Sequence, residues 1–198
     1  ANKWLQNILK VIDADNKIVP VSGYRSLFEQ TEIYTSSIEE NGLEFTKQYV
    51  AYPNTSEHQT GLAIDLGLNQ EPIDFIRPAF PYQGICQDFR LKASQYGFIE
   101  RYTSDKTNIT NISAEEWHFR YVGYPHSEII EQNHFCLEEY IDYLRQFDSS
   151  NNCLKFENYE IYYIAMESDE KEFILDGAEI SGNNVDGFIV TKRIIDKE

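Results

Sequence analysis

The spacing of apolar positions along the first 150 residues changes repeatedly between a helical and a strand-like period. In residues 2–12, Trp4, Leu5, Ile8 and Leu9 follow the three-to-four residue spacing of one helix face. Ser26 and the Glu29 three positions later form a capping box, which predicts the start of another helix. Five segments are predicted to be helical: residues 2–12, 27–40, 85–96, 125–132 and 137–147.

Short apolar runs between these helices predict the strands of a sheet. They are residues 18–21, 62–66, 98–102 and 117–122. In the last run Trp117, Phe119 and Tyr121 share one face while His118 and Arg120 share the other, as expected for a half-buried strand. Residues 67–84 hold three prolines and little periodicity, which predicts a long surface loop.

The composition changes at Ser149-Ser150-Asn151-Asn152, which indicates a boundary. Three strand-like runs follow, at residues 159–165, 171–175 and 185–191. They predict a small β-meander appended to an α+β core. The predicted organisation is therefore a catalytic domain over residues 1–148 and a C-terminal extension over residues 149–198.

Charge and cysteine content exclude several classes of function. The chain has 198 residues and a formal net charge of −16, so a nucleic acid is a poor partner. No apolar run is long enough to span a bilayer. The three cysteines form no CxxC pair, which argues against a thiolate metal site and favours free thiols in a reducing compartment. The expected location is the cytoplasm, with the cell envelope as the alternative if an anchor preceded Ala1.

Two separated segments carry the residue types of a zinc site. His58 lies seven positions before Asp65, and His118 lies on the predicted strand 117–122. Asp65 shares its strand face with Gly61 and Ala63, and these small neighbours leave room for a metal ion and a substrate. Two imidazoles and one carboxylate leave a fourth position open for water, which is typical of catalytic rather than structural zinc sites. The chain is therefore expected to bind one zinc ion and to catalyse a hydrolysis.

A hydrolase of this kind also needs a base, and the sequence offers two. Glu115 and Glu116 both precede His118 closely. Strand alternation favours Glu116, which shares the His118 face, but Glu115 lies where the chain is still turning, so alternation does not decide between them. His126 and His134 have no partner at ligand spacing and are expected to be ordinary polar residues.

Three motifs together resemble a known family. Residues 22–26 read SGYRS, residues 56–67 read SEHQTGLAIDLG and residues 117–123 read WHFRYVG. The pattern SxHxxGxAxD followed by ExxH is similar to the zinc D-alanyl-D-alanine peptidases of vancomycin resistance, of the VanY and VanXY type. The resemblance covers about residues 18–147. It implies the α+β metallopeptidase fold with an antiparallel sheet core that some lysis enzymes and hedgehog signalling domains share.

The resemblance assigns roles to residues at the matching positions. The metal ligands of the family match His58, Asp65 and His118, and its catalytic base matches Glu115. The arginine that follows Gly-Tyr in the family, which steadies the oxyanion, matches Arg25.

Positions that contact substrate in the family match Gln30 and Ser56. Ser22, three positions before Arg25, is neutral where an acidic residue would pair with the ammonium group of a free dipeptide. Carboxypeptidase activity on longer peptides is therefore expected, with dipeptidase activity beside it.

The expected function is cleavage of the terminal D-Ala from peptidoglycan precursors that end in D-Ala-D-Ala, which contributes to vancomycin resistance. One alternative is a peptidoglycan endopeptidase of the same fold, which Arg25 and the lack of a basic wall-binding module disfavour. Another is a zinc-containing binding module without activity, which would need neither Glu115 nor Arg25.

Overall fold

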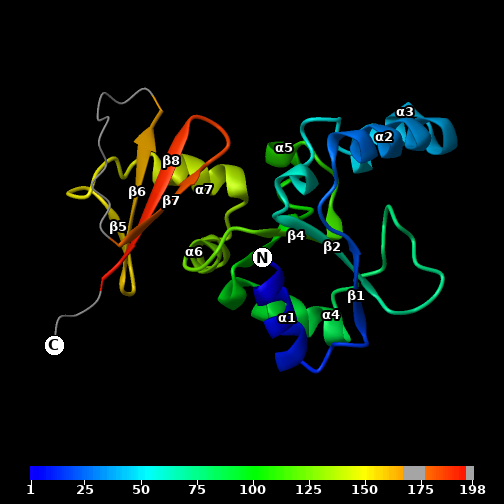
Figure 1. Cartoon of the computed structure of the whole chain (residues 1–198), viewed down its shortest axis with the longest axis horizontal. Helices are drawn as coiled ribbons and strands as arrows, with labels where there is room; N and C mark the ends of the chain where they lie inside the picture. The colour runs from blue at the N-terminus through cyan, green and yellow to red at the C-terminus, as the bar shows by residue number, and fades with distance from the viewer. Residues whose placement is uncertain (167–176, 195–198) are drawn as a thin grey trace. The chain divides into compact units, whose positions relative to one another are not determined.

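The computed structural model of the chain describes residues 1–166 and 177–194 (Figure 1). It divides into two compact units, residues 1–136 and 137–198. The predicted strand at residues 171–175 lies outside the described residues. The assignment of catalysis to residues 1–148 and of an extension to residues 149–198 stays a prediction.

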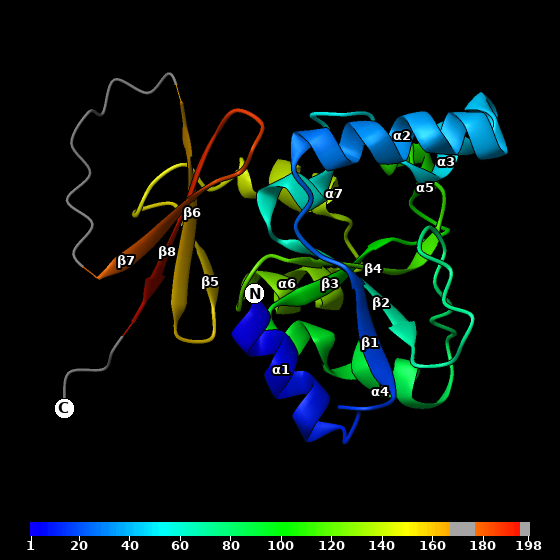
Figure 2. The same cartoon turned by 45° about the vertical axis from the view of Figure 1, so that its right-hand side comes forward.

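The first unit combines one sheet with helices, as an α+β pattern predicts (Figure 2). Its helices are α1 (Asn2–Val11), α2 (Leu27–Asn41), α3 (Leu43–Tyr49), α4 (Gly84–Ala93), α5 (Thr107–Thr110) and α6 (His126–Asn133), with 3₁₀ turns η1 (Glu57–Thr60) and η2 (Ser94–Tyr96). Its strands are β1 (Ile18–Ser22), β2 (Ala63–Leu68), β3 (Phe98–Tyr102) and β4 (Glu115–Tyr121).

The four strands form an antiparallel sheet in the order β1-β2-β4-β3. The two central strands, β2 and β4, pair in a register that sets Asp65 opposite His118. The pairing of β3 with β4 is regular from Phe98 to Glu100 and then shifts, so that Tyr102 pairs with Glu115. This irregularity matters for the site, because an irregular strand no longer alternates its faces strictly.

The core of this unit packs the sheet against α1 and α4. Leu5 and Ile8 of α1 are buried in the same apolar cluster as Phe89 of α4 and Phe119 of β4. The rings of Phe80, Phe89 and Phe119 meet edge to face with centroids 5.0 to 5.8 Å apart, an arrangement that aromatic pairs prefer. The buried aromatic face predicted for residues 117–122 therefore anchors the strand that carries His118.

Local signals in the sequence are confirmed at the helix ends. Ser26 accepts a hydrogen bond from the Glu29 backbone N–H, and the Glu29 side chain accepts one from the Ser26 backbone, so the capping box is complete. Gly97 ends the segment of α4 and η2 with φ at +89°, and an added Cβ would lie 2.6 Å from the Tyr121 ring. Only glycine fits this position without displacing β4.

Two features of the first unit differ from the sequence-based expectation. The short helices α3 and α5 lie in segments where no helix was predicted. Strand β4 begins at Glu115 rather than at Trp117, so both candidate glutamates belong to the strand. Pairing with β3 extends the strand there, which a pattern of alternating apolar residues cannot indicate because Glu115 and Glu116 are both polar.

The second unit contains helix α7 (Leu137–Leu144) and a sheet of β5 (Leu154–Phe156), β6 (Tyr159–Ala165), β7 (Ala178–Gly182) and β8 (Gly187–Arg193). All its pairings are antiparallel, but the order is β5-β6-β8-β7. Strand β6 therefore pairs with β8, whereas a simple meander would pair it with β7. Asn183 shapes the tight β7–β8 connection by accepting three backbone hydrogen bonds. Among the described helices none combines the length and apolarity needed to cross a bilayer.

The burial of Phe119 predicts a large contribution to stability. Its side chain is fully buried between Phe80 and Phe89. We expect Phe119→Ala to lower the free energy of unfolding by about 3–5 kcal/mol, because the cavity cannot collapse between two fixed rings. Urea denaturation measures the change. Phe28→Ala, at a ring that is 70% exposed, is the control and should change it by less than about 0.5 kcal/mol.

Candidate metal and catalytic site

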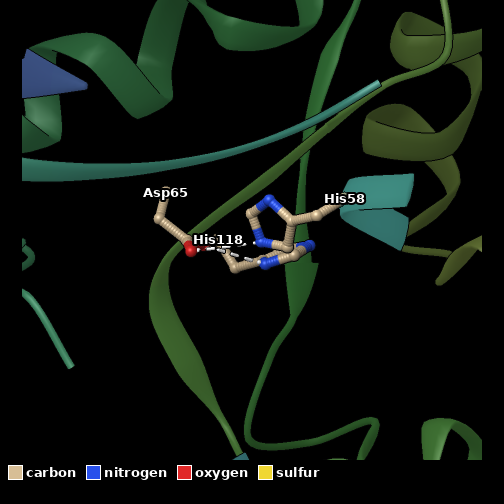
Figure 3. A group of neighbouring side chains, drawn as sticks. All are labelled: His58, Asp65 and His118. Carbon is tan, nitrogen blue, oxygen red and sulfur yellow. Dashed lines mark hydrogen bonds and ion pairs between the residues drawn. The ribbon is translucent and has the colours of Figure 1, made fainter. Parts of the chain in front are cut away.

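Three metal-ligating side chains converge from three separate elements (Figure 3). His58 lies in η1, Asp65 in β2 and His118 in β4. One ligand atom from each lies within 4.8 Å of the others, and all three residues are buried. The sheet register brings Asp65 and His118 together, and the turn η1, directly before β2, folds His58 back toward them. The predicted ligand group is thus assembled.

Each histidine presents one ring nitrogen to Asp65. His58 Nε2 lies 3.1 Å from Asp65 Oδ2, while its Nδ1 lies 2.6 Å from the Gly23 carbonyl oxygen and so donates a hydrogen bond to it. His118 Nδ1 lies 3.0 Å from Asp65 Oδ1. Two imidazole nitrogens and one carboxylate form a donor set that suits zinc and leaves a coordination position for water or substrate.

The electrostatics of this cluster favour a cation. Burial alone would lower the pKa of His118, but the Asp65 carboxylate, at hydrogen-bond distance, and the nearby carboxylates of Glu57 and Glu115 raise it to about 9. Burial would likewise raise the pKa of Asp65, yet the two histidines hold it well below its usual range. A group of buried carboxylates that stabilises a positive charge this strongly is a fitting site for a divalent ion.

Of the two candidate bases, Glu115 is the one that reaches the cluster. Its Oε2 lies 3.6 Å from His118 Nδ1, and the residue lines the same cavity. Glu116 is not among the described residues that line this cavity. The irregular pairing between β3 and β4 explains the choice, because it turns Glu115 toward the side of His118 against strict alternation. Burial raises the pKa of Glu115 to about 8, which suits a group that both accepts and returns a proton.

Arg25 extends into the site from the segment between β1 and α2. Its Nη2 donates to Asp65 Oδ2 over 2.7 Å, and its Nε donates to Ser22 Oγ over 2.7 Å. The backbone N–H of Arg25 also donates to the His58 carbonyl, which ties the two segments together. A guanidinium that is held by two hydrogen bonds, on a backbone held by a third, is well placed to meet a substrate oxygen.

Of the predicted substrate contacts, Ser22 and Ser56 line the cavity. Gln30 does not line it. Its side chain is fully buried, and Nε2 donates to the Ala51 carbonyl over 2.8 Å. Ala51 itself lines the cavity, so in this structure Gln30 supports a wall rather than forming it.

The cavity around the cluster has a volume of about 380 Å³, within the range of ligand sites. One side is formed by α2, through Glu32 and Ser36, and another by the long loop after β2, through Phe75 and Ile76. The sequence does not indicate these wall residues, because a polar helix face and an aperiodic loop carry no pattern that is typical of a site.

Glu57 also lines the cavity, although the sequence did not predict it as a site residue. Its Oε1 accepts from Arg101 Nε over 2.9 Å and lies 3.2 Å from Arg120 Nη1. Burial would raise the pKa of Glu57, but His118 and the two arginines outweigh burial and keep the carboxyl ionised. The adjacency of Glu57 to His58 in the sequence was the one signal available.

Comparison with known proteins identifies a family that the chain resembles over most of its length. The model of a family described as D-alanyl-D-alanine carboxypeptidase, VanY, matches residues 1–124. The chain is 48% identical over 147 residues to the bifunctional D-Ala-D-Ala dipeptidase and D-Ala-D-Ala carboxypeptidase VanXYC of Enterococcus gallinarum. The matched residues cover 74% of this chain and 77% of that protein. The chain spans about half the length of three other curated relatives that it matches.

Solved structures of VanXY-type and VanY-type enzymes also match this chain. The vancomycin resistance D,D-dipeptidase VanXYg, in complex with a D-Ala-D-Ala phosphinate analog, matches with a TM-score of 0.88 and 54% identity over 96% of this chain and 78% of that one. A mutant of the D,D-pentapeptidase VanY from a VanB-type resistance cassette, in complex with Zn(II), matches with a TM-score of 0.57 and 32% identity over 71% and 80% of the two chains. The predicted α+β peptidase fold is confirmed.

The geometry of the ligand group predicts that one divalent ion binds with a requirement for all three side chains. We expect purified protein dialysed against metal-free buffer to retain about one equivalent of metal, and His118→Ala to retain almost none, because two ligands bind much more weakly than three. Elemental analysis measures the content. His134→Ala, at a histidine outside the group, is the control and should retain the wild-type content. Wild-type protein without metal after incubation with zinc would contradict the assignment.

Proposed function

The chain belongs to the VanY family of D-alanyl-D-alanine carboxypeptidases, and on that premise we propose that it is a zinc-dependent D,D-peptidase. Its substrates would be peptidoglycan precursors that end in D-Ala-D-Ala, and their cleavage would contribute to vancomycin resistance. The observation that carries the proposal is the convergence of His58, Asp65 and His118 with Glu115 and Arg25 around one cavity. The cytoplasmic location stays a prediction.

The residues of the site divide into holding and reacting groups. His58, Asp65 and His118 would hold one zinc ion, as their buried donor set allows. When bound, zinc supplies Lewis acidity toward the scissile carbonyl and lowers the pKa of water. Asp65 also keeps Arg25 in place through its second contact, so one carboxylate organises both the metal ligands and the guanidinium.

Glu115 would move the protons of the reaction. Its carboxylate would take a proton from the attacking water and return it to the leaving amine of D-Ala. The pKa raised by burial makes the carboxylate a stronger base than an exposed glutamate, and the same burial keeps bulk water from competing for the proton.

Arg25 would stabilise the charge that develops on the scissile carbonyl oxygen. Its hydrogen bonds to Ser22 and Asp65 hold the guanidinium before substrate arrives, so little reorganisation is needed in the transition state. A non-catalytic zinc module would have no use for either Arg25 or Glu115 in these positions. This supports a peptidase over the binding alternative.

The proposal is tested by the hydrolysis of two substrates measured side by side. Release of D-Ala from free D-Ala-D-Ala and from a muramyl pentapeptide analogue that ends in D-Ala-D-Ala should both be detected, and a chelator should abolish both. Cleavage within cross-linked peptidoglycan without release of D-Ala from either substrate would favour the endopeptidase instead.

The position of Glu115 predicts that it is required for turnover but not for metal binding. We expect Glu115→Ala to retain zinc and to lose about 10²-fold or more in kcat, the usual size of acid–base catalysis. Kinetics on D-Ala-D-Ala, with metal content as the second measurement, check this. Glu116→Ala is the matched control, since its side chain does not line the cavity within the described part of the chain. A dead Glu116 variant with an active Glu115 variant would reverse the assignment.

The neutral Ser22 predicts activity on both substrate lengths. A carboxylate at this position would attract the ammonium group that only the free dipeptide carries beside the scissile bond. We expect Ser22→Asp to raise the ratio of kcat/KM for D-Ala-D-Ala to that for the pentapeptide analogue. The ratio is informative even if the new carboxylate also pairs with Arg25, because that pairing lowers both activities.

Ser36→Asp supplies the control for this change. It adds the same charge to the α2 side of the cavity, away from the contact between Ser22 and Arg25. We expect it to leave the ratio near the wild-type value. Wild-type activity restricted to the free dipeptide would show that the neutral Ser22 does not determine the substrate range.

A further inference from the structure

Two buried polar atoms beside the ligand group face each other without a hydrogen bond. His118 Nε2 and Glu57 Oε2 both lack a hydrogen-bond partner within residues 1–166 and 177–194. They lie 3.6 Å apart, slightly beyond hydrogen-bond length. A buried donor or acceptor that stays unsatisfied costs about 1–3 kcal/mol, so two such atoms at this separation require an explanation.

In the other histidine of the group, His58, both ring nitrogens have a polar partner. His58 presents Nε2 to Asp65, and its Nδ1 donates to the Gly23 carbonyl over 2.6 Å. His118 presents the opposite nitrogen, Nδ1, to Asp65 at 3.0 Å, so its remaining nitrogen, Nε2, points to Glu57. Each ligand ring therefore has an acceptor behind it, a backbone carbonyl for His58 and a carboxylate for His118.

Glu57 is fixed in a way that leaves only one oxygen for His118. Arg101 from β3 and Arg120 from β4 both bind Oε1, at 2.9 and 3.2 Å. The two guanidinium groups compensate the buried charge, and this makes Glu57 a poor competitor for a metal ion. They also anchor the carboxylate to β4, which carries His118, and to the neighbouring strand β3, so Oε2 is held toward Nε2.

We propose that Glu57 is a positioning residue for the metal ligand His118. Glu57 Oε2 accepts a hydrogen bond from His118 Nε2–H, which keeps the proton off Nδ1 and directs the Nδ1 lone pair at the metal. The inference rests on the proposed zinc site. Carboxylates behind metal-bound histidines fix the tautomer and the ring orientation and make the ligand more basic, and losing one typically weakens metal binding about 10- to 100-fold.

The tautomer of His118 in the wild-type protein tests the ring orientation that the proposal requires. Protein labelled with ¹⁵N-histidine and loaded with zinc should show His118 protonated at Nε2 and unprotonated at Nδ1, with the signal assigned from a His118→Ala spectrum. A proton on Nδ1 would overturn the proposal. Wild-type protein that binds no zinc would overturn the proposed metal site as well, which separates the two failures.

Variants then measure the contribution of Glu57 to zinc affinity by competition with a chromogenic chelator. We expect Glu57→Ala to bind zinc about 10- to 100-fold more weakly. Glu57→Gln should lose less, because its amide oxygen still accepts a hydrogen bond from Nε2–H. Gln keeps the acceptor but not the charge. If only the charge of Glu57 mattered, Glu57→Gln would lose as much zinc affinity as Glu57→Ala.

Glu100→Gln is the matched control for the loss of a buried ion pair. Glu100 binds Arg90 over 2.9 Å with its side chain 14% exposed, close to the 13% of Glu57, but its carboxylate is directed to Arg90 and Tyr82 instead of a ligand histidine. Both variants should lower thermal stability, while only the Glu57 variants should weaken zinc binding. Equal zinc affinities of Glu57→Ala and wild type, or an equal loss in Glu100→Gln, would refute the positioning role.

Discussion

The antiparallel pairing of β2 with β4 is the constraint on which the site depends. It sets Asp65 directly opposite His118, although 53 positions separate them in the chain. A slip of one residue would turn one of the two side chains to the other face of the sheet and break the ligand group. The register is held from the opposite face, where Leu66 and Phe119 are fully buried in the apolar core. Packing on one face of the sheet thus determines which side chains meet on the other face.

Charge is the second constraint, because the site concentrates ionised groups in a buried place. Arg25 pairs with Asp65, and Arg101 and Arg120 pair with Glu57. Buried ion pairs of this kind contribute little net stability, since desolvation offsets most of the attraction. Their effect is positional, because each carboxylate is bound by arginine and is also directed to a histidine. The arginines therefore orient the carboxylates that face His58 and His118.

The sequence allowed the strands that carry Asp65 and His118 and the capped helix after Arg25 to be predicted, because each depends on a local pattern. The structure brings His58, Asp65 and His118 together, while their assignment as metal ligands stays a prediction. Strand alternation could not indicate that Glu115 lines the cavity and Glu116 does not, since this depends on irregular pairing with β3. Glu57 and the supporting position of Gln30 were missed for the same reason: both depend on partners distant in the sequence. In the second unit, the order of β7 and β8 is likewise a property of pairing and not of any single strand.

The residues proposed for the chemistry and the opposite walls of the cavity come from different parts of the structure. Asp65, His118 and Glu115 stand on paired strands, whose backbone hydrogen bonds limit their movement. The opposite walls of the cavity come from the α2 face and from the loop after β2, where Phe75 is largely exposed. Loops and exposed helix faces tolerate substitution better than a central sheet does. On the proposed function, substrate length can therefore change through these walls, or through Ser22 at the end of β1, while His58, Asp65 and His118 stay as they are.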